Sequence, residues 1–281
     1  MQLRLRRFLM PTAFIAALSC FAVVLAATGN DAARPKICEP EGIRSGACAT
    51  ALAGNAQLAF ELDWLFGGKS QRGWGLYLPL IQSLIGSDTG ADERGFAQAL
   101  ARWQSVQGLV PSGVLDRDTW SRMIASWQSR RIRDSVYPSS NQLVTVPVAD
   151  LYDTERPMEL RQVERNTYTA YKRMVETAMR DLAIAPGEKY LKIVSAFRSR
   201  EYQSQLRRRS PQSGRAGLAV NSPHFSGRAL DLYVGGEPVS TRDDNRALQT
   251  KTPVYRWLVK NAARFGFQPY FYEPWHWEYC N

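Results

Sequence analysis

Apolar residues recur at helical spacing in the first half of the chain. In the stretch GFAQALARWQSVQGLVPSGV they are three or four positions apart, which predicts an amphipathic helix bearing Phe96, Leu100, Trp103 and Val106. Gly108 is expected to close this helix, and Asp116, three residues before Thr119, is expected to begin another. That next helix carries Trp120, Met123 and Ile124. Residues 74–128 as a whole alternate helical patterns with polar turns.

The pattern changes after residue 128. Residues 129–150 contain prolines and a serine pair without sustained periodicity, which indicates a linker or an extended entry strand. A long helix is expected next, because one apolar stripe continues until the sequence APGEK. This stripe consists of Leu160, Val163, Tyr168, Tyr171, Met174, Val175, Met179 and Leu182. Residues 191–195 then alternate as a strand does, and residues 199–206 are expected to form a helix just after Arg198.

The N-terminus has the order of a secretory signal. Arginines precede an apolar run, and the small residues Val24 and Ala26 lie where a signal peptidase would cut, so residues 1–27 are expected to be a signal peptide. An uncleaved anchor is the alternative. Export to the periplasm, the cell wall or the extracellular space is therefore expected, with no lasting membrane span.

Composition is that of a globular protein with room for two modest domains, since 44% of the 281 residues are hydrophobic and 22% are charged. Loss of the leader's three arginines would lower the formal net charge from +10 to +7. A basic exported protein suits an anionic cell wall or lipid surface. No basic run with interleaved aromatic residues suggests nucleic acid.

Three cysteines remain after the expected leader. An oxidising compartment predicts a disulfide, either between Cys38 and Cys48 or from one of these to Cys280. None of them lies in a C-x-x-C pair, so a cysteine-rich zinc site is not expected.

The chain has two histidines, and both lie in segments with acidic neighbours. His224 precedes Asp231 in NSPHFSGRALDLYV, with Gly227 between them where the backbone must turn or approach another segment closely. His276 follows Glu273 by three positions in FYEPWHWEY. The first pair alone would be explained by a structural hydrogen bond, but the second histidine favours a metal site.

Two imidazoles and one carboxylate suit a catalytic zinc ion. His224, Asp231 and His276 would leave the fourth tetrahedral position open for water. Zinc is preferred over magnesium or calcium, which prefer all-oxygen ligand sets. Glu273 remains as the general base that takes a proton from water and passes it to the leaving amine, with Glu278 as the competing base.

Three motifs follow one another in the C-terminal half of the chain. The first, S-x-[FY]-R-S-x-x-x-Q, comprises Ser195, Phe197, Arg198, Ser199 and Gln203. S-x-H-x-x-G-x-A-x-D follows at residues 222–231, and E-x-W-H at residues 273–276. Together, over about residues 143–279, they resemble the zinc D-alanyl-D-alanine carboxypeptidases of the vancomycin-resistance type, which are Hedgehog-like metal peptidases. The resemblance implies an α+β catalytic domain, expected over residues 151–281, with a small antiparallel sheet that carries the ligands.

The resemblance also implies roles for single residues. The implied ligands of one Zn²⁺ are His224, Asp231 and His276, and the implied general base is Glu273. Arg198 would bind the substrate carboxylate or the oxyanion that forms at the scissile carbonyl, a role that suits a permanently charged guanidinium. Gln203 and Ser222 match positions that line the substrate site.

The helical half carries a second resemblance. The pattern W-Q-x-x-x-G-L followed by x-x-x-G-x-L-D-x-x-T-W, within residues 74–128, resembles the small three-helix peptidoglycan-binding domain. The resemblance implies a small all-α domain that attaches the protein to the wall and contributes no chemistry. Residues 28–73, which include FELDWLFGGKSQRG, remain unassigned.

Three functions are compatible with these features. An exported zinc peptidase that removes the terminal D-alanine from D-Ala-D-Ala-terminated stem peptides of peptidoglycan is favoured. An endopeptidase with the same zinc site is the alternative, since the motifs are shared by both. A non-catalytic wall-binding protein is a third hypothesis, but it predicts loss of the base or of a ligand, and all four residues are present.

Overall fold

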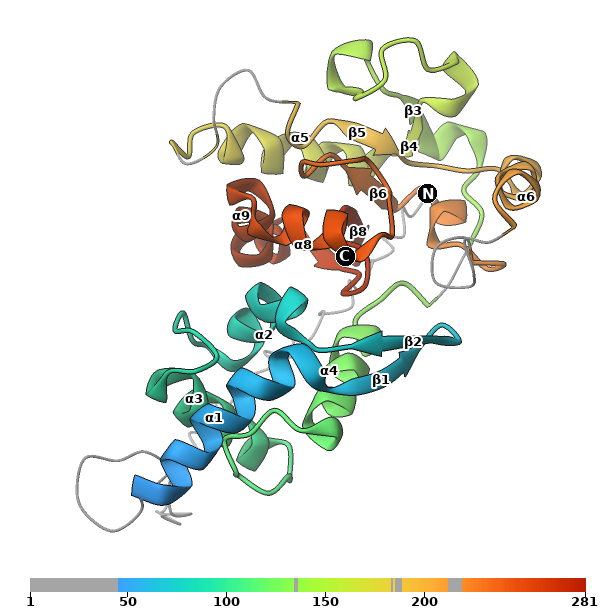
Figure 1. The fold of residues 1–281 in the computed structure, drawn as a ribbon. Helices are drawn as coiled ribbons and strands as arrows, with labels where there is room; N and C mark the ends of the chain where they lie inside the picture. The colour runs from blue at the N-terminus through green and yellow to red at the C-terminus, as the bar shows by residue number, and fades with distance from the viewer. Residues whose placement is uncertain (1–44, 134–135, 183, 185–188, 212–218) are drawn as a thin grey trace, which may run out of the picture. The chain divides into compact units, whose positions relative to one another are not determined.

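The computed structural model describes residues 45–133, 136–182, 184, 189–211 and 219–281 (Figure 1). The expected signal peptide and a pairing between Cys38 and Cys48 therefore lie outside the described residues. Cys48 is disulfide-bonded. Cys280 is a free thiol whose Sγ lies 3.2 Å from the carbonyl oxygen of Arg130, so the alternative of a disulfide to Cys280 is wrong. Within the described part of the chain, no helix is both long enough and apolar enough to cross a bilayer.

The helices expected in the first half are present. They are α2 (Leu78–Ile85), α3 (Arg94–Val106) and α4 (Arg117–Ser129). Asp116 caps α4, because its Oδ1 accepts a hydrogen bond from the Thr119 amide at 2.9 Å. Phe96 and Leu100 of α3 are fully buried, whereas Val106 is 82% exposed, so the apolar face ends before the helix does.

The unassigned segment adds a helix and a hairpin to this half. α1 (Ser45–Glu61) is followed by the antiparallel strands β1 (Asp63–Phe66) and β2 (Lys69–Arg72), joined by Gly67 and Gly68 at positive φ. Trp64 of β1 packs edge-on against Trp120 of α4 at a ring-centroid distance of 5.2 Å. The segment is therefore part of the core around the three helices, which gather with it at the blue-to-green end of the chain in Figure 1.

The second half is the α+β domain that the sequence predicted. Its four-stranded antiparallel sheet has the order β5 (Ile193–Ser195), β6 (Ala229–Leu232), β8 (His276–Tyr279), β7 (Phe267–Pro269). A separate pair joins β3 (Leu143–Thr145) to β4 (Gln162–Glu164). The helices are α5 (Arg165–Ala178), α6 (Arg200–Arg209), α8 (Asp243–Lys251) and α9 (Pro253–Asn261). β3 lies in the segment expected to be a linker or an entry strand.

The long helix expected over the 160–182 stripe is wrong at both ends. Val163 lies in β4, and α5 begins only at Arg165, because the Glu164 side chain caps it by accepting hydrogen bonds from the Asn166 and Thr167 amides. At the other end the helix stops at Ala178, and Leu182 is fully exposed. Strand pairing and capping therefore override the continuous apolar stripe.

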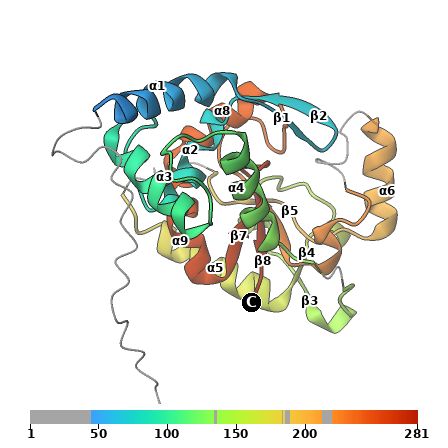
Figure 2. The ribbon, with the colours of Figure 1, turned by 90° about the horizontal axis from the view of Figure 1, so that it is seen from below.

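The two halves share one hydrophobic cluster. It includes Trp64 and Trp120 from the first half and Phe271 and Trp277 from the second. Trp127, near the end of α4, stacks on Phe271 with ring centroids 5.8 Å apart. Figure 2 shows α4 beside the strands β7 and β8. The last helix of the first half thus packs against the turn that leads into β8.

Candidate active site

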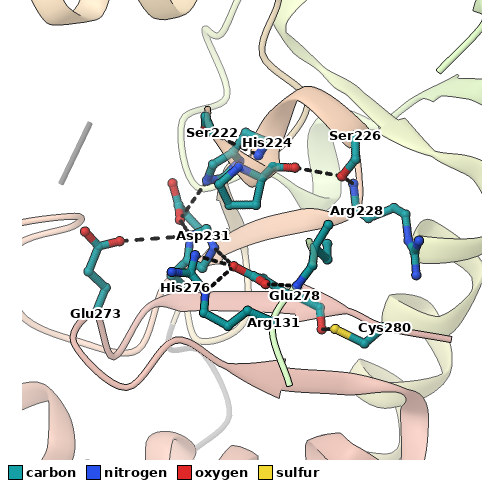
Figure 3. Close-up of polar contacts among 12 residues, drawn as sticks. Arg131, Ser222, His224, Ser226, Arg228, Asp231, Glu273, His276, Glu278 and Cys280 are labelled. Carbon is teal, nitrogen blue, oxygen red and sulfur yellow. Dashed lines mark hydrogen bonds and ion pairs between the residues drawn. The ribbon is translucent and has the colours of Figure 1, made fainter. Parts of the chain in front are cut away.

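The three side chains expected to bind metal meet at one point (Figure 3). Asp231 of β6 lies directly opposite His276 of β8, and its Oδ1 is 2.9 Å from the His276 Nδ1. The same oxygen lies 3.3 Å from Nε2 of His224, which belongs to the short 3₁₀ helix Pro223–Ser226. One donor atom from each residue lies within 4.8 Å of the others, and all three residues are buried. His224, Asp231 and His276 therefore form a possible metal site.

Strand register explains how residues distant in sequence come together. Asp231 pairs with His276 on one side and with Ser195 on the other, so β6 is the centre of the site. Side chains directly opposite each other in an antiparallel pair have Cβ atoms about 5 Å apart. Gly227 ends the 3₁₀ helix at φ +68°, and a Cβ there would lie 3.0 Å from the Glu164 amide nitrogen. The glycine thus allows both the turn and the close approach expected from the sequence.

The ring of His224 is oriented by the backbone. Its Nδ1 lies 2.6 Å from the Ala196 carbonyl oxygen, which can only accept a hydrogen bond, so Nδ1 carries the proton. The lone pair of the neutral ring is then on Nε2, which faces Asp231. Burial and the nearby Arg198 charge lower the pKa of His224 to about 4, so the ring is neutral at neutral pH.

Glu278 orients His276 from the opposite edge of its ring. The Nε2 of His276 is 3.2 Å from Oε1 of Glu278. Glu278 is also held by Arg131, whose Nε lies 2.8 Å from the same oxygen, and by the Ile132 amide at 2.7 Å from Oε2. Burial alone would raise the pKa of Glu278, but the hydrogen bond from His276 and the Arg131 charge lower it to about 2. Its carboxylate is thus fully engaged away from Asp231, which disfavours its role as the competing base.

Glu273 has the opposite environment. Its Oε2 is 4.0 Å from His276 Nδ1, and its Oε1 is buried without a hydrogen-bond partner among the described residues. Burial, reinforced by the negative charge of Asp231, raises the pKa of Glu273 to about 8. Glu273 thus has a raised pKa and one oxygen without a partner among the described residues, and it lies next to a possible metal site. These are the properties of a proton acceptor.

Arg198 contacts Asp231 rather than lying free in the cavity. Its NH2 is 2.5 Å from Asp231 Oδ2, its Nε donates to Ser195 Oγ at 2.9 Å, and its NH1 lies 3.4 Å from Gln203 Oε1. Burial raises the pKa of Asp231, but the interactions with His224, with the Arg198 guanidinium and with His276 hold it well below its usual range. Asp231 is therefore an ionised carboxylate whose Oδ1 faces both histidines and whose Oδ2 faces Arg198.

Gln203 and Ser222 also lie at this site. Gln203 projects from α6, and its amide nitrogen donates to the Ala219 carbonyl oxygen at 3.0 Å. The hydroxyl of Ser222 accepts a hydrogen bond from the His224 amide at 3.3 Å, so Ser222 caps the short helix that carries the histidine. Ser222 lines the cavity, whereas Gln203 contacts Arg198, which does.

A cavity of about 420 Å³ opens onto these residues. Its walls include His224, Asp231, Glu273 and His276, together with Tyr270 and Trp275. Three arginines of the described part of the chain also line it, namely Arg131, Arg156 and Arg198. Of these, the sequence singled out only Arg198. Arg131 and Arg156 have no motif around them that could have indicated this position.

Comparison with known proteins agrees with this geometry. Residues 160–281 match the VanY family, described as D-alanyl-D-alanine carboxypeptidase. Over these residues the chain is similar to the VanY family. Residues 75–123 match a putative peptidoglycan-binding domain. Both resemblances inferred from the sequence motifs are thereby confirmed.

Among solved structures, one similar chain is described as the LdcB LD-carboxypeptidase, in a study of peptidoglycan recognition. Its sequence identity is 24%, its TM-score is 0.38, and the match covers 53% of this chain and 72% of that one. A search of curated proteins finds no match.

These matches support the coarse function. The protein is a peptidase of the VanY type that acts on peptidoglycan, and it carries a peptidoglycan-binding region ahead of the peptidase domain. The family is generally metal-dependent, in agreement with the His224, Asp231 and His276 cluster. Wall-directed domains of both kinds suggest an exported protein.

Proposed function

We propose that this protein is a zinc-dependent D-alanyl-D-alanine carboxypeptidase that trims the stem peptides of peptidoglycan. The observation that carries the proposal is the buried cluster of His224, Asp231 and His276 in a cavity wall, with the unpaired Glu273 Oε1 beside it. Two imidazole nitrogens and a carboxylate oxygen are the donor set of many catalytic zinc sites. When bound, the zinc ion would polarise the scissile carbonyl and lower the pKa of a water molecule.

Glu273 is the general base in this proposal. It accepts a proton from the attacking water and donates it to the amine that leaves when the peptide C–N bond breaks. Its burial supports this role, since a carboxyl with a pKa near neutrality can both accept and release a proton at working pH. Asp231 and the two histidines would hold the metal, and none of these three residues is required to exchange a proton with the substrate.

The cations of the cavity support a carboxypeptidase in particular. A substrate that ends in D-alanine presents a carboxylate, which needs a positive partner near the scissile bond. Arg131 and Arg156 line the cavity together with Arg198. Arg198 already pairs with Asp231 at 2.5 Å. Its role is therefore to hold Asp231 in place and to contribute positive charge toward the oxyanion that forms at the scissile carbonyl. Gln203 and Ser222 fix Arg198 and His224, respectively.

The remaining parts of the chain fit an exported wall enzyme. We propose that residues 1–27 are a signal peptide, that residues 74–128 bind peptidoglycan and that residues 151–281 are catalytic. A periplasmic or cell-wall location follows from this arrangement, because the substrate is assembled there.

The test is mass spectrometry of a muramyl pentapeptide ending in D-Ala-D-Ala after incubation with the mature protein, with and without a zinc chelator. Loss of a single alanine that the chelator blocks is the expected result. A pentapeptide that stays intact, while cross-linked peptidoglycan is cut in a chelator-sensitive manner, would favour the endopeptidase. No cleavage of either substrate would contradict a peptidase role for the site.

A further inference from the structure

The segment that follows the last helix of the first half reaches the metal site directly. α4 ends at Ser129, and Arg131 lies two residues beyond it. The Nε and NH2 of Arg131 approach Oε1 of Glu278 at 2.8 and 2.5 Å, and the Ile132 amide approaches Oε2 at 2.7 Å. The Glu278 side chain is 1% exposed and the Arg131 side chain 23%, so this pair is shielded from solvent. Residues 131 and 132 therefore hold both oxygens of one buried carboxylate.

The Glu278 carboxylate also determines which ring nitrogen of His276 carries a proton. An ionised carboxylate only accepts hydrogen bonds, so the His276 Nε2, 3.2 Å from Glu278 Oε1, must donate (Figure 3). In the neutral ring the lone pair is then left on Nδ1, the atom that faces Asp231 at 2.9 Å. Metal-binding histidines commonly donate their other ring N–H to such a carboxylate, which fixes the ring for metal binding.

A second contact from the same segment supports the turn before His276. The Arg131 guanidinium lies 3.8 Å from the centroid of the Tyr270 ring, and Tyr270 packs edge-on against His276 at 5.7 Å. One turn earlier, Trp127 stacks on Phe271. The turn of residues 270–276, which carries Glu273 and His276, is thus held by the end of α4 and the residues after it.

We propose that Arg131 and Glu278 are positioning residues, through which the segment directly after the helical region fixes the ring of His276 for metal binding. The helical region, which by the resemblance would only attach the protein to the wall, then also supports the metal site through the segment that follows it. This inference rests on the proposed function only in that a metal binds at His276. An ion pair that merely joined two domains would not need to share its acceptor oxygen with a metal ligand, as Glu278 Oε1 does.

The test compares the metal affinity of metal-free variants. Arg131→Gln and Glu278→Gln each remove one member of the pair while keeping a similar shape, and the double variant removes both. Arg133→Gln is the matched control, because Arg133 is exposed, lies two residues away and loses the same charge. The zinc dissociation constant is measured by competition with a chromophoric chelator, and the cobalt-substituted proteins are compared by visible absorption. Thermal unfolding verifies that each variant is folded, and Arg131→Lys provides a milder change.

Both single variants are expected to bind zinc about 10- to 100-fold more weakly than the wild type, the usual cost of losing a residue that orients a metal ligand. Their cobalt spectra should be altered, and Arg133→Gln should match the wild type in both measurements. The double variant should be no weaker than Glu278→Gln, because Arg131 acts through Glu278. Arg131→Lys should lose less than Arg131→Gln.

Two results would overturn the inference. Zinc affinities and cobalt spectra of the single variants equal to those of Arg133→Gln would show that the pair has no effect on His276. Losses that add fully in the double variant would show that Arg131 does not act through Glu278. A wild-type protein that binds no zinc would contradict the proposed function itself, whereas tight zinc binding by every variant contradicts this inference alone.

Discussion

Asp231 and His276 face each other across β6 and β8, and Oδ1 of the aspartate lies 2.9 Å from Nδ1 of the histidine. Asp231 also binds Arg198 through its other oxygen. The aspartate is thus shared between two histidines and a buried guanidinium. Its removal affects metal binding and folding together.

Replacement of Asp231 by Asn should destabilise the metal-free protein by about 3–5 kcal/mol, because it leaves the buried Arg198 without its counter-charge. Asp244→Asn is the control, since Asp244 pairs with Arg242 in a fully exposed position and should have no measurable effect on stability. Urea denaturation at neutral pH measures both. Equal stabilities of the two variants would contradict the importance assigned to the buried pair.

Replacement of Glu273 by Gln should lower the rate of hydrolysis by about 10²- to 10⁴-fold, the contribution expected of a general base. Zinc content measured by mass spectrometry should be unchanged, because Glu273 is not among the three ligands. Glu159→Gln, on an exposed turn, is the control and should retain full activity. Full activity of Glu273→Gln would require another base.

The metal-free protein should become less stable as the pH rises from about 6.5 to 9. The pKa of Glu273 is raised by burial to about 8, and that of His276 is raised, despite its burial, by hydrogen bonds to Asp231 and Glu278, to about 9. In the unfolded chain both residues titrate at lower pH, so the folded state binds more protons throughout this range, and stability falls as these protons are lost.

The measurement is the free energy of unfolding in urea at several pH values. Glu273→Gln should show a smaller fall than the wild type, because one of the two groups no longer titrates. Zinc should reverse the trend, since it binds the deprotonated histidine and its stabilisation grows with pH. Constant stability of the metal-free protein over this range would contradict the environments described for both groups.

Gly227→Ala should cost more stability than Gly86→Ala. Both glycines have nearly the same positive φ, +68° and +69°, so the backbone strain of about 1–2 kcal/mol is common to both. Only at Gly227 would the added Cβ meet the Glu164 amide at 3.0 Å, and this crowding should add at least about 1 kcal/mol. Urea denaturation of the two variants gives the difference, and a difference of zero would mean that the approach to Glu164 relaxes without cost.

The sequence indicated the cluster of His224, Asp231 and His276 because motifs carry local information. His224, Gly227 and Asp231 lie in one short segment, and the antiparallel pairing of β6 with β8 brings His276 to them. Helix ends with a capping signal were also predictable, as at Asp116 and Ser199, each of which caps a helix in the structure.

Long-range contacts could not be predicted in this way. Arg131 lies in the basic stretch SRRIR, where it resembles a solvated arginine, and its partner Glu278 is 147 residues away. The hairpin around Trp64 was unassigned for the same reason, since its partners Trp120 and Phe271 are distant in sequence. The prediction of one long helix from Leu160 to Leu182 was wrong at its start, because the spacing of apolar residues carries no information about the strand pairing of Val163 with Val144.

Metal-dependent release of D-alanine tests the central claim most directly. The protein is stripped of metal, incubated with a D-Ala-D-Ala-terminated pentapeptide, and then given one equivalent of zinc. The account predicts no release before zinc is added, one D-alanine released per peptide afterwards, and release by Glu273→Gln that with zinc is about 10²- to 10⁴-fold slower than by the wild type. Equal release with and without zinc would contradict it.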